Sequence, residues 1–327
     1  MKYNQLFEKF KGKRILVIGD VMLDSYILGT VTRISPEAPV PIISLEKKDN
    51  RIGGAGNVAL NLKHLGAAPI IASVIGNDSE GTILKELFVK RGISTEGLMI
   101  SSERKTTVKT RVISSKQQLL RIDSEDTHPL TANNENALLA KIELLLKNDV
   151  DAVILEDYDK GVLNKHNIQK IITLAKQLNI PVTADPKKEN FHYYSGLTLF
   201  KPNLKELKEG LNLDFNFEQE KERFELAVDT LRKDIPHIIS LVTLSEQGVF
   251  ICNENDKAYI PAHKREITDV SGAGDTVIAV ATLCLLANTS LTELAMISNI
   301  AGGMVCEKPG VVSITFEALK NEVNELL

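Results

Sequence analysis

Residues 269–276 read Asp-Val-Ser-Gly-Ala-Gly-Asp-Thr and run directly into the apolar segment 277–286. This pattern predicts a glycine-rich loop that opens a helix, with the carboxylate of Asp275 on the first helical turn. Backbone N–H groups at a helix start have no partner within the helix, and the helix dipole adds partial positive charge, so the loop can hold an anion. An anion site beside a carboxylate base is what phosphoryl transfer to an alcohol requires.

Outside this loop, short apolar runs alternate with segments of helical periodicity. Residues 13–20 form a β-branched run that ends in Gly-Asp, which is typical of a buried parallel strand opening into a loop at its carboxyl end. Further strands are expected at 68–75, 151–155, 181–184, 197–200 and 238–244. Helices are expected at 57–65, 78–91, 133–146, 165–178, 217–233, 276–287, 291–306 and 316–327. This order predicts a doubly wound α/β fold around a mostly parallel sheet.

Two segments, 25–45 and 104–123, break this rhythm with alternating apolar and polar residues. The alternation predicts antiparallel strands. Because both segments leave the α/β core and return to it, we expect them to pair into a small β-sheet beside the mouth of the main fold, as a lid or a dimer surface. Residues 1–327 as a whole are expected to form one domain that carries this lid.

The composition is that of an ordinary soluble protein, since 43% of the 327 residues are hydrophobic, 25% are charged and the net charge is −4. So small a charge favours neither nucleic acid nor an anionic membrane as a partner, although local basic residues can still bind a small anion. No apolar stretch reaches the roughly 20 residues of a membrane span, and the N-terminus lacks the apolar segment of a signal peptide. Cys252, Cys284 and Cys306 are odd in number and lie in apolar segments, so we expect reduced, buried thiols in a cytoplasmic protein.

A second glycine-rich run, Gly-Gly-Ala-Gly-Asn at 53–57, precedes the helix at 57–65. Glycines let the backbone approach a ligand closely, and the side chain of Asn57 can both donate to and accept from a polyol. A tight loop-to-helix junction without a ligand fits the same residues. The run is not the dinucleotide-binding fingerprint, because the G-x-G-x-x-G spacing is absent.

Carboxylates follow two of the expected strands. Asp20 and Asp24 come at and after the end of the first strand, and Asp185 follows the strand at 181–184. In open α/β sheets the carboxyl ends of the strands face the ligand crevice, where Asp24 can accept two sugar hydroxyls. Turn formation is the alternative for these aspartates.

A candidate magnesium site combines Asp185 and Lys187 with two residues at the start of a helix. Asn203 and Glu206 are three residues apart and share a helix face, so the group can hold a hydrated Mg²⁺ that bridges nucleotide phosphates. The same pair also fits a helix N-cap with glutamate at the third position. The six histidines show no metal-ligand spacing.

Four cations lie near the second lid segment: Lys105, Lys109, Arg111 and Arg121. Lys109 and Arg111 are two residues apart and therefore share one face of a strand. Solvated lid charges are the ordinary interpretation, but arginine suits the oxygens of a phosphate-bearing substrate.

Together these motifs resemble the ribokinase/phosphofructokinase-B family of sugar kinases. The two glycine-rich runs resemble its two signatures, and Asn-Leu-Lys-Glu at 203–206 resembles its N-x-x-E magnesium motif. Within the family, Gly-Asp-Val-Met-Leu-Asp at 19–24, Arg-Ile-Ser-Pro-Glu-Ala-Pro-Val-Pro at 33–41 and Asp-Pro-Lys at 185–187 look like the D-glycero-D-manno-heptose 7-phosphate kinases, in the stand-alone form without a nucleotidyltransferase domain. Lys188 departs from that pattern, because a glycine often follows Asp-Pro-Lys.

The resemblance implies a ribokinase-like α-β-α sandwich that transfers the γ-phosphoryl group of ATP to the C1 hydroxyl of heptose 7-phosphate. The product is the 1,7-bisphosphate, a precursor of ADP-heptose and the lipopolysaccharide core. The resemblance also implies Mg²⁺, a monovalent cation such as K⁺, and a homodimer formed through the β lid, with no nucleic acid or membrane partner. The alternatives are another kinase of the family acting on a different sugar or sugar phosphate, and a non-catalytic sugar- or nucleotide-binding regulator.

Carried onto this sequence, the resemblance assigns a role to each candidate residue. Asp275 is the base, with a pKa that we expect the helix N-terminus to lower. The transferred phosphoryl group is held by the N–H groups of Gly272, Ala273 and Gly274. Sugar hydroxyls are bound by Asp20, Asp24, Gly53, Gly54 and Asn57. The substrate phosphate is bound by Arg33, Lys109, Arg111 and Arg121. The nucleotide is contacted by Asp185, Lys187, Asn203, Thr243, Gly248 and Asn299. Metal ions are held by Asn203 and Glu206 for Mg²⁺, through water, and by Asp269 for the monovalent cation.

Overall fold

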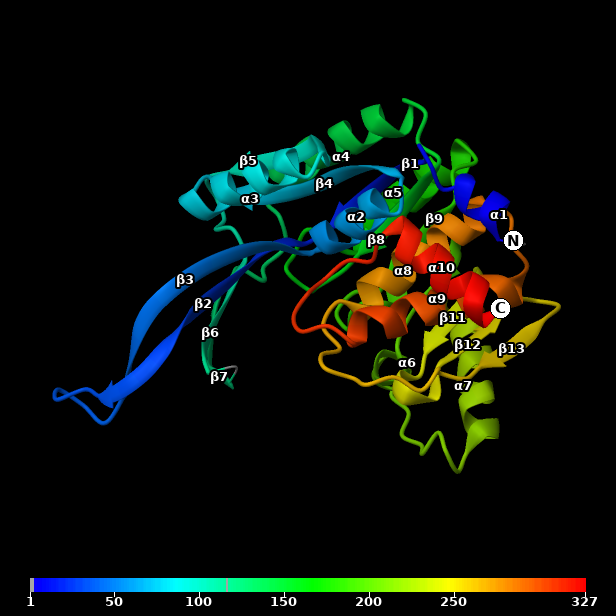
Figure 1. The fold of residues 1–327 in the computed structure, drawn as a ribbon. Coiled ribbons are helices and arrows are strands. Elements are labelled where there is room, and N and C mark those ends of the chain that lie inside the picture. The colour runs from blue at the N-terminus through cyan, green and yellow to red at the C-terminus, as the bar shows by residue number, and fades with distance from the viewer. Residues whose placement is uncertain (1–2, 116) are drawn as a thin grey trace.

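The computed structural model describes residues 3–115 and 117–327, so the first two residues and position 116 of the second lid segment lie outside the described residues. A nine-stranded sheet crosses the molecule in the order β13-β12-β11-β10-β9-β8-β1-β4-β5 (Figure 1). Its strands are β1 (Arg14–Gly19), β4 (Ala68–Gly76), β5 (Ser94–Ser101), β8 (Ala152–Glu156), β9 (Val182–Asp185), β10 (Leu197–Phe200), β11 (His237–Thr243), β12 (Val249–Cys252) and β13 (Lys257–Ile260).

The sheet reverses its strand order beside β1, which pairs in parallel with β4 on one side and with β8 on the other. Such a reversal opens a crevice at the carboxyl ends of the strands, where open α/β sheets bind ligands. The doubly wound, mostly parallel sheet expected from the sequence is therefore confirmed. Among the described strands of this sheet only β12 runs opposite to the others, and it pairs antiparallel with β11 and with β13. The strands β5, β12 and β13 were not expected.

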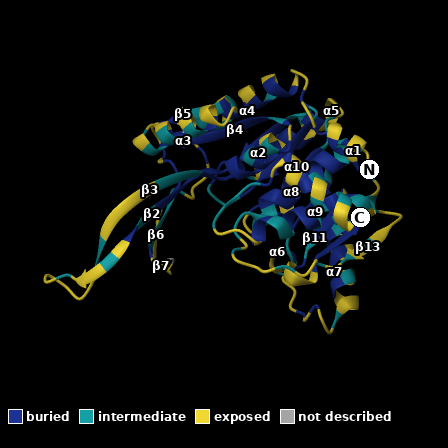
Figure 2. Cartoon of the chain, viewed as in Figure 1, coloured by how far each residue is buried: buried dark blue, intermediate teal, exposed yellow. Residues whose placement is uncertain are grey.

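Helices cover both faces of the sheet and bury one apolar cluster on each side (Figure 2). The helices of the first face are α1 (Asn4–Glu8), α2 (Ala55–His64), α3 (Ser79–Lys90), α8 (Ala273–Leu286), α9 (Leu291–Cys306) and α10 (Phe316–Leu326). Those of the second face are α4 (Ala132–Leu146), α5 (Lys165–Gln177), α6 (Leu204–Gly210) and α7 (Lys221–Asp234). Short 3₁₀ turns lie at η1 (Phe191–Tyr193) and η2 (Ser245–Gln247). This arrangement is the α-β-α sandwich that the resemblance implied.

Several helix starts differ from the prediction, since α2 begins at Ala55 and not at residue 57, α8 begins at Ala273 and not at residue 276, and α1 was not expected. Helix α7 begins at Lys221 and not at residue 217, because Phe217 leaves the helical path to pack its ring against Phe224, 5.0 Å between centroids. None of the helices in the described part of the chain is long and apolar enough to cross a membrane.

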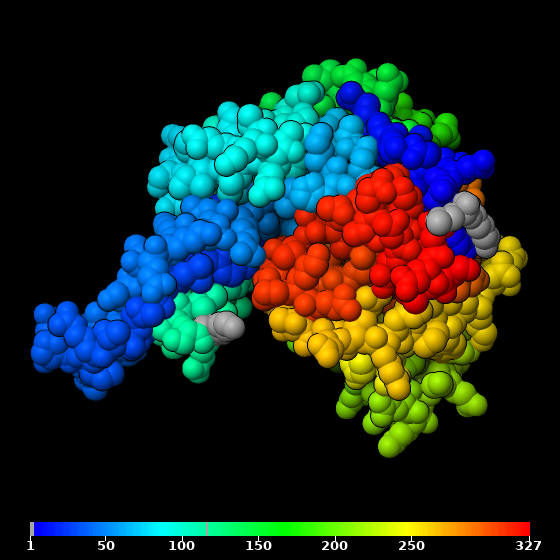
Figure 3. All heavy atoms as spheres, viewed as in Figure 1, coloured from blue at the N-terminus to red at the C-terminus, as the bar shows by residue number. Residues whose placement is uncertain are grey.

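The two lid segments form a separate four-stranded sheet in the order β3-β2-β6-β7. Its strands are β2 (Val21–Ile34), β3 (Pro41–Gly54), β6 (Val108–Ser114) and β7 (Gln117–Ser124). The pairing of the two segments is as expected, but the all-antiparallel expectation is wrong, since β2 and β6 run parallel. Each segment makes its own antiparallel hairpin, and the far end of the β2–β3 hairpin projects beyond the rest of the molecule (Figure 3).

Candidate active site

The N-terminus of α8 lies at the crevice and has no side-chain cap among the described residues. Gly272 takes a left-handed conformation (φ +81°), in which glycine is favoured. The N–H of Ala273 donates to the carbonyl of Val270 at 3.3 Å, whereas the N–H groups of Gly272 and Gly274 have no partner within the described chain. The helix therefore presents free donors and the positive end of its dipole to the crevice.

Asp275, on the first turn of α8, is buried and accepts two hydrogen bonds. The Asn57 side-chain amide donates to one carboxylate oxygen at 2.7 Å, and the Tyr158 hydroxyl donates to the other at 2.7 Å. The donors come from α2 and from the loop after β8, so two distant parts of the chain fix the carboxylate. Its orientation is set before any ligand arrives.

The pKa of Asp275 is shifted in the direction opposite to the one predicted from the sequence. Burial raises the pKa of this carboxyl above its ordinary value, and the hydrogen bonds from Asn57 and Tyr158 offset only part of that effect. The helix N-terminus does favour the charged form, but the side chain is buried, and removal from water disfavours the charged form more strongly. A raised pKa makes Asp275 a stronger base than the sequence suggested.

The glycine-rich run at 53–57 places Asn57 against Asp275. Gly54 is left-handed (φ +60°), and a Cβ there would lie 2.3 Å from the carbonyl oxygen of Asp20. A Cβ on Gly53 would lie 2.2 Å from a carboxylate oxygen of Asp24. Both glycines thus let the lid strand β3 pass close to the end of β1 and turn into α2. Their contact with sugar stays a prediction.

Asp20 organises the loop after β8. Its carboxylate accepts from the backbone N–H groups of Tyr158, Lys160 and Val162 at 2.9–3.0 Å. Burial, followed by the charge of Asp157, raises the pKa of Asp20 to about 6. Three backbone donors fill three of the about four acceptor positions of this carboxylate, so the geometry gives Asp20 a role in holding Tyr158, and its contact with sugar stays a prediction.

The lid brings several predicted residues to one face of its sheet. Asp24 on β2 is buried and accepts from the guanidinium of Arg111 on β6. Lys109 lies beside Asp24 in the strand register, and Arg121 on β7 lies opposite Arg111. Arg33 is different, since it is exposed and pairs with Ile42 near the far end of the β2–β3 hairpin. Within one chain the structure does not bring Arg33 to the crevice.

The Asp185 region is a dense ion-pair network. Asp185 pairs with the buried ammonium of Lys201 at 2.8 Å, and Lys187 pairs with Glu206 at 2.7 Å. Burial would lower the pKa of Lys187, but the charges of Asp185 and Glu206 outweigh it and hold the pKa above its ordinary value. Asn203 and Glu206 also form a reciprocal capping box at the start of α6, with both bonds at 2.8 Å.

The capping-box alternative for Asn203 and Glu206 is therefore realised in the structure. It does not exclude the magnesium role, because each carboxylate oxygen retains an acceptor position beside its single partner. The described residues contain no group of three or more His, Cys, Asp or Glu side chains that could hold a metal directly. The donors fit Mg²⁺ as the sequence suggested, through water and substrate phosphates.

Asp269 ties two loops together. Its oxygens accept from the N–H groups of Ser271 and Gly310, each at 2.9 Å. Burial would raise the pKa of Asp269, but these hydrogen bonds outweigh it and lower the pKa. The carboxylate thus stays ionised while it shapes the loop before α8.

A cavity of about 530 Å³ lies beside the α8 N-terminus. It is bounded by the turn after β11, the segment 262–270 and helix α9, and it reaches Ala273 and Gly274. Its lining includes all three remaining nucleotide candidates: Thr243, Gly248 and Asn299. Its volume is that of a typical small-molecule site, and its open connection to Gly274 suits a nucleotide whose phosphates point at the helix.

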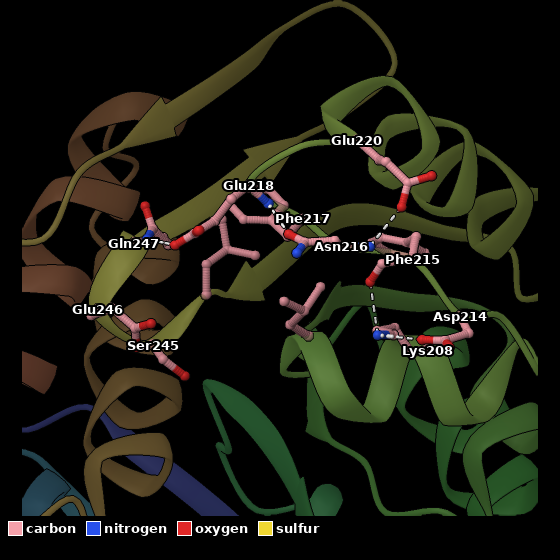
Figure 4. A pocket seen from close by; sticks show the side chains of 12 residues that line it. Lys208, Asp214, Phe215, Asn216, Phe217, Glu218, Glu220, Ser245, Glu246 and Gln247 are labelled. Atoms are coloured by element: carbon pink, nitrogen blue, oxygen red, sulfur yellow. Dashed lines mark hydrogen bonds and ion pairs between the residues drawn. The ribbon is translucent and has the colours of Figure 1, made fainter.

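A neighbouring cavity of about 570 Å³ shares Ser245 and Glu246 with the first one but lies on the side of α6 (Figure 4). Its polar groups bind one another, since Lys208 pairs with Asp214 at 2.9 Å and Gln247 donates to Glu218 at 3.0 Å (Figure 4). None of the residues that line it contacts Asp275. It is not part of the candidate active site.

Sequence reasoning missed three residues of the crevice: Glu156, Tyr158 and Lys201. All three lie at the carboxyl end of a strand or just beyond it, as Asp20 and Asp185 do. The same positional rule would have selected them. Glu156 is fully buried, and neither of its oxygens has a hydrogen-bond partner among the described residues.

The model of the pfkB family of carbohydrate kinases matches residues 13–317. Curated relatives include bifunctional proteins HldE of Helicobacter pylori, 39% identical over 96% of this chain and 67% of the relative, and of Syntrophotalea carbinolica, 38% identical over 95% of this chain and 63% of the relative. The chain spans less than two thirds of the length of several of these relatives, including that of S. carbinolica.

Solved structures share the fold at low sequence identity. Escherichia coli phosphofructokinase-2 in complex with potassium has a TM-score of 0.78 at 19% identity, covering 97% of this chain and 99% of that chain. Arabidopsis thaliana ribokinase complexed with ribose and ATP has a TM-score of 0.72 at 16% identity, covering 96% and 99%. The match of the family model over nearly the whole chain shows that this protein belongs to the pfkB family and is a carbohydrate kinase.

Proposed function

We propose that this kinase transfers the γ-phosphoryl group of ATP to the C1 hydroxyl of D-glycero-D-manno-heptose 7-phosphate, giving the 1,7-bisphosphate. The observation that carries the reaction type is the buried, doubly held Asp275 on an uncapped helix start. The choice of sugar is supported by the 33–41 segment and by relatives named HldE that are 38–41% identical over the kinase part.

Asp275 accepts the proton of the attacking hydroxyl. Phosphoryl transfer passes through a loose transition state, so the protein contributes mainly position and charge stabilisation. The free N–H groups of Gly272 and Gly274 point to where the charge of the transferring group lies. Asp275 and these donors sit within one turn of the same helix, which holds base and anion site in a fixed relation.

The nucleotide occupies the cavity beside α9, with its phosphates toward Gly274. Asn203 and Glu206 would hold Mg²⁺ through water, and the metal would neutralise phosphate charge as the leaving group departs. Lys187 is already charged and lies between Asp185 and Glu206, where it can meet a phosphate oxygen. Asp269 holds the loop before α8 in its conformation. Its carboxylate would also hold a monovalent cation.

The sugar lies between Asp275 and the charged face of the lid. Asp24 and Asn57 contact hydroxyls, since one oxygen of Asp24 and the side-chain oxygen of Asn57 have no hydrogen-bond partner in the described chain. Lys109 and Arg111 supply positive charge for the substrate phosphate. Arg33 lies too far along the hairpin for this role within one chain. It would serve only if the hairpin reached a second copy.

We also propose that two copies pair through the lid and that the enzyme works in the cytoplasm, where ATP and sugar phosphates are available. The exposed apolar side chains of β7, Leu120 and Ile122, support the pairing, because they lie on the lid sheet away from the body. Burying them against a second copy would remove that surface from water.

A coupled ADP-release assay tests the substrate. With D-glycero-D-manno-heptose 7-phosphate, ribose and fructose 6-phosphate as acceptors, we expect kcat/KM for the heptose phosphate to exceed the others by at least about a hundredfold, the discrimination that lost polar contacts produce. Phosphorus NMR of the product should show a new anomeric phosphate. Equal kcat/KM on ribose would overturn the substrate assignment and leave a kinase of another sugar. No ADP release with any of the three acceptors would overturn the proposed substrate as well.

A further inference from the structure

We infer that Tyr158 is a positioning residue for the base, whose hydroxyl holds Asp275 in the orientation that accepts the sugar proton. The inference rests on the proposed role of Asp275. The Tyr158 hydroxyl donates to one carboxylate oxygen at 2.7 Å while Asn57 donates to the other. Two donors from opposite flanks stop the carboxylate from rotating.

The arrangement leaves room for the substrate. An ionised carboxylate has about four acceptor positions, and Asn57 and Tyr158 fill two of them. A sugar hydroxyl can therefore donate to Asp275 without displacing Tyr158. Tyr158 is itself only half-buried, so its ring forms part of the wall that faces the crevice.

Hydrogen bonds of the neighbouring residues fix the position of Tyr158. Asp20 accepts from the N–H of Tyr158 and from those of two residues that follow it. The preceding Asp157 points into the protein, where it accepts from Asn190 at 3.0 Å and from the Tyr194 hydroxyl at 2.8 Å. Two buried carboxylates therefore fix the loop on both sides of the ring.

The ring also connects the base to the phosphate side of the crevice. The ammonium of Lys187 lies 5.4 Å from the centre of the Tyr158 ring, within the range of a cation–π contact. The same ammonium pairs with Glu206. Tyr158 thus lies between the group that accepts the proton and a cation placed to meet a nucleotide phosphate.

Tyr158 remains a donor throughout the working pH range. Burial, and then the charge of Asp275, raises the pKa of Tyr158 well above its ordinary value, so the hydroxyl keeps its proton. The groups that face Asp275 are Asn57 from α2, Glu156 and Tyr158 from β8 and its loop, Asp185 at the end of β9 and Lys187 from the loop that follows. Among them Tyr158 and Asn57 are the direct donors.

The test compares Tyr158→Phe with Tyr194→Phe. Both changes remove one hydroxyl that donates to a buried aspartate, but only Tyr158 donates to Asp275. For Tyr158→Phe we expect kcat to fall about tenfold or more, as the loss of a hydrogen bond to a charged group implies, with KM for ATP unchanged. Because Tyr158 lowers the pKa of Asp275, the acidic limb of the kcat profile should move to higher pH.

Tyr194→Phe should lose comparable thermal stability but keep kcat within about twofold and leave the acidic limb in place, because Asp157 keeps its hydrogen bond from Asn190 and Tyr194 donates nothing to Asp275. A kcat and pH profile of Tyr158→Phe equal to those of Tyr194→Phe would overturn the inference. So would an equal loss of activity in Tyr194→Phe, because the effect would then come from loop packing.

A substrate-free measurement separates this inference from the proposed function. Carbon-13 NMR of aspartate carboxyl groups, with Asp275→Asn to assign the resonance, reports the titration of Asp275 in the wild type and both tyrosine variants. An upward shift confined to Tyr158→Phe supports the inference even if heptose 7-phosphate is not the acceptor. No shift in Tyr158→Phe contradicts it even if that sugar is phosphorylated.

Discussion

Glu156 is the most unusual single residue of the crevice, because it is fully buried at the end of β8 with no partner for either oxygen among the described residues. Burial, and then the charges of Asp185 and Asp275, raise its pKa well above the ordinary value. A glutamic acid held neutral in this way supplies no second negative charge beside the base.

This gives a stability prediction with a definite sign. Because the folded state holds the Glu156 proton more tightly than the unfolded state does, the wild type loses stability as pH rises above about 4.5, by about 1.4 kcal/mol per pH unit up to the folded pKa. Glu156→Gln keeps the neutral shape and removes that loss. Urea unfolding should therefore show equal stability at pH 4.5 and a more stable variant at pH 8.

Glu86→Gln is the control, since it removes an exposed carboxylate from α3. It should change the free energy of unfolding by less than about 0.5 kcal/mol at either pH. A Glu156→Gln variant that is less stable than wild type at pH 8 would show that Glu156 is ionised and bound to a group that the structure does not reveal.

At this scale the sequence identified the residues of the two glycine-rich motifs but not their environment. Asn57 and Asp275 are 218 positions apart and meet at 2.7 Å, as two signatures of one family would. Tyr158 belongs to no glycine-rich or metal-like pattern, and only its place just beyond the strand at 151–155 could have marked it. The raised pKa of Asp275 depends on burial by the whole fold, which local sequence does not contain.

Among the elements, the start of α8 restricts most strongly which residue its sequence can carry. Gly272 is left-handed, and a Cβ there would lie 2.8 Å from the side-chain nitrogen of Asn57, the group that holds Asp275. Gly272→Ala should therefore lower the stability by about 1–2 kcal/mol through backbone strain and also lower kcat, by about tenfold or more, through the displaced Asn57. Steady-state kinetics and thermal unfolding check the two parts separately.

Gly12→Ala is a matched control, because Gly12 has a similar φ of +73° and a Cβ added there would meet no atom within 4 Å. It should cost similar stability and leave kcat unchanged. If both variants lose activity equally, the effect of Gly272→Ala is general strain and not a change at the site.

Most elements followed from periodicity, and the exceptions have physical reasons. The strands β12 and β13 are only four residues each, too short for alternation to show. The pair Asn203 and Glu206 satisfies two patterns at once, and only the structure shows that both capping bonds form. The parallel pairing of β2 with β6 depends on how distant segments meet, which local patterns do not specify.

At the scale of the whole molecule, the lid is the surface through which we propose that two copies pair. On β7, Leu120 and Ile122 alternate with Arg121 and so face away from the charged side of the sheet. Leu120 lies beside Val112 of β6, which lies beside Ile27 of β2, so apolar side chains cross three strands. This stripe is what a second copy would cover.

Leu120→Asp should therefore convert a dimer into a monomer at micromolar concentration in analytical ultracentrifugation, because it places a charge in an apolar interface. Leu144→Asp, on the exposed face of α4, is the control and should leave the assembly unchanged. A wild type that is monomeric, or a Leu120→Asp variant that remains a dimer, would rule out pairing through this face.

The most direct test of the central claim is the turnover of Asp275→Asn. Asparagine keeps the shape of the side chain but cannot accept the hydroxyl proton as a base, so kcat should fall at least about a thousandfold, within the range that general base catalysis contributes. ATP binding, measured by calorimetry, should persist, because the cavity beside α9 is untouched. A purified, folded Asp275→Asn enzyme that keeps more than about a tenth of the wild-type kcat would contradict the assignment of Asp275 as the base.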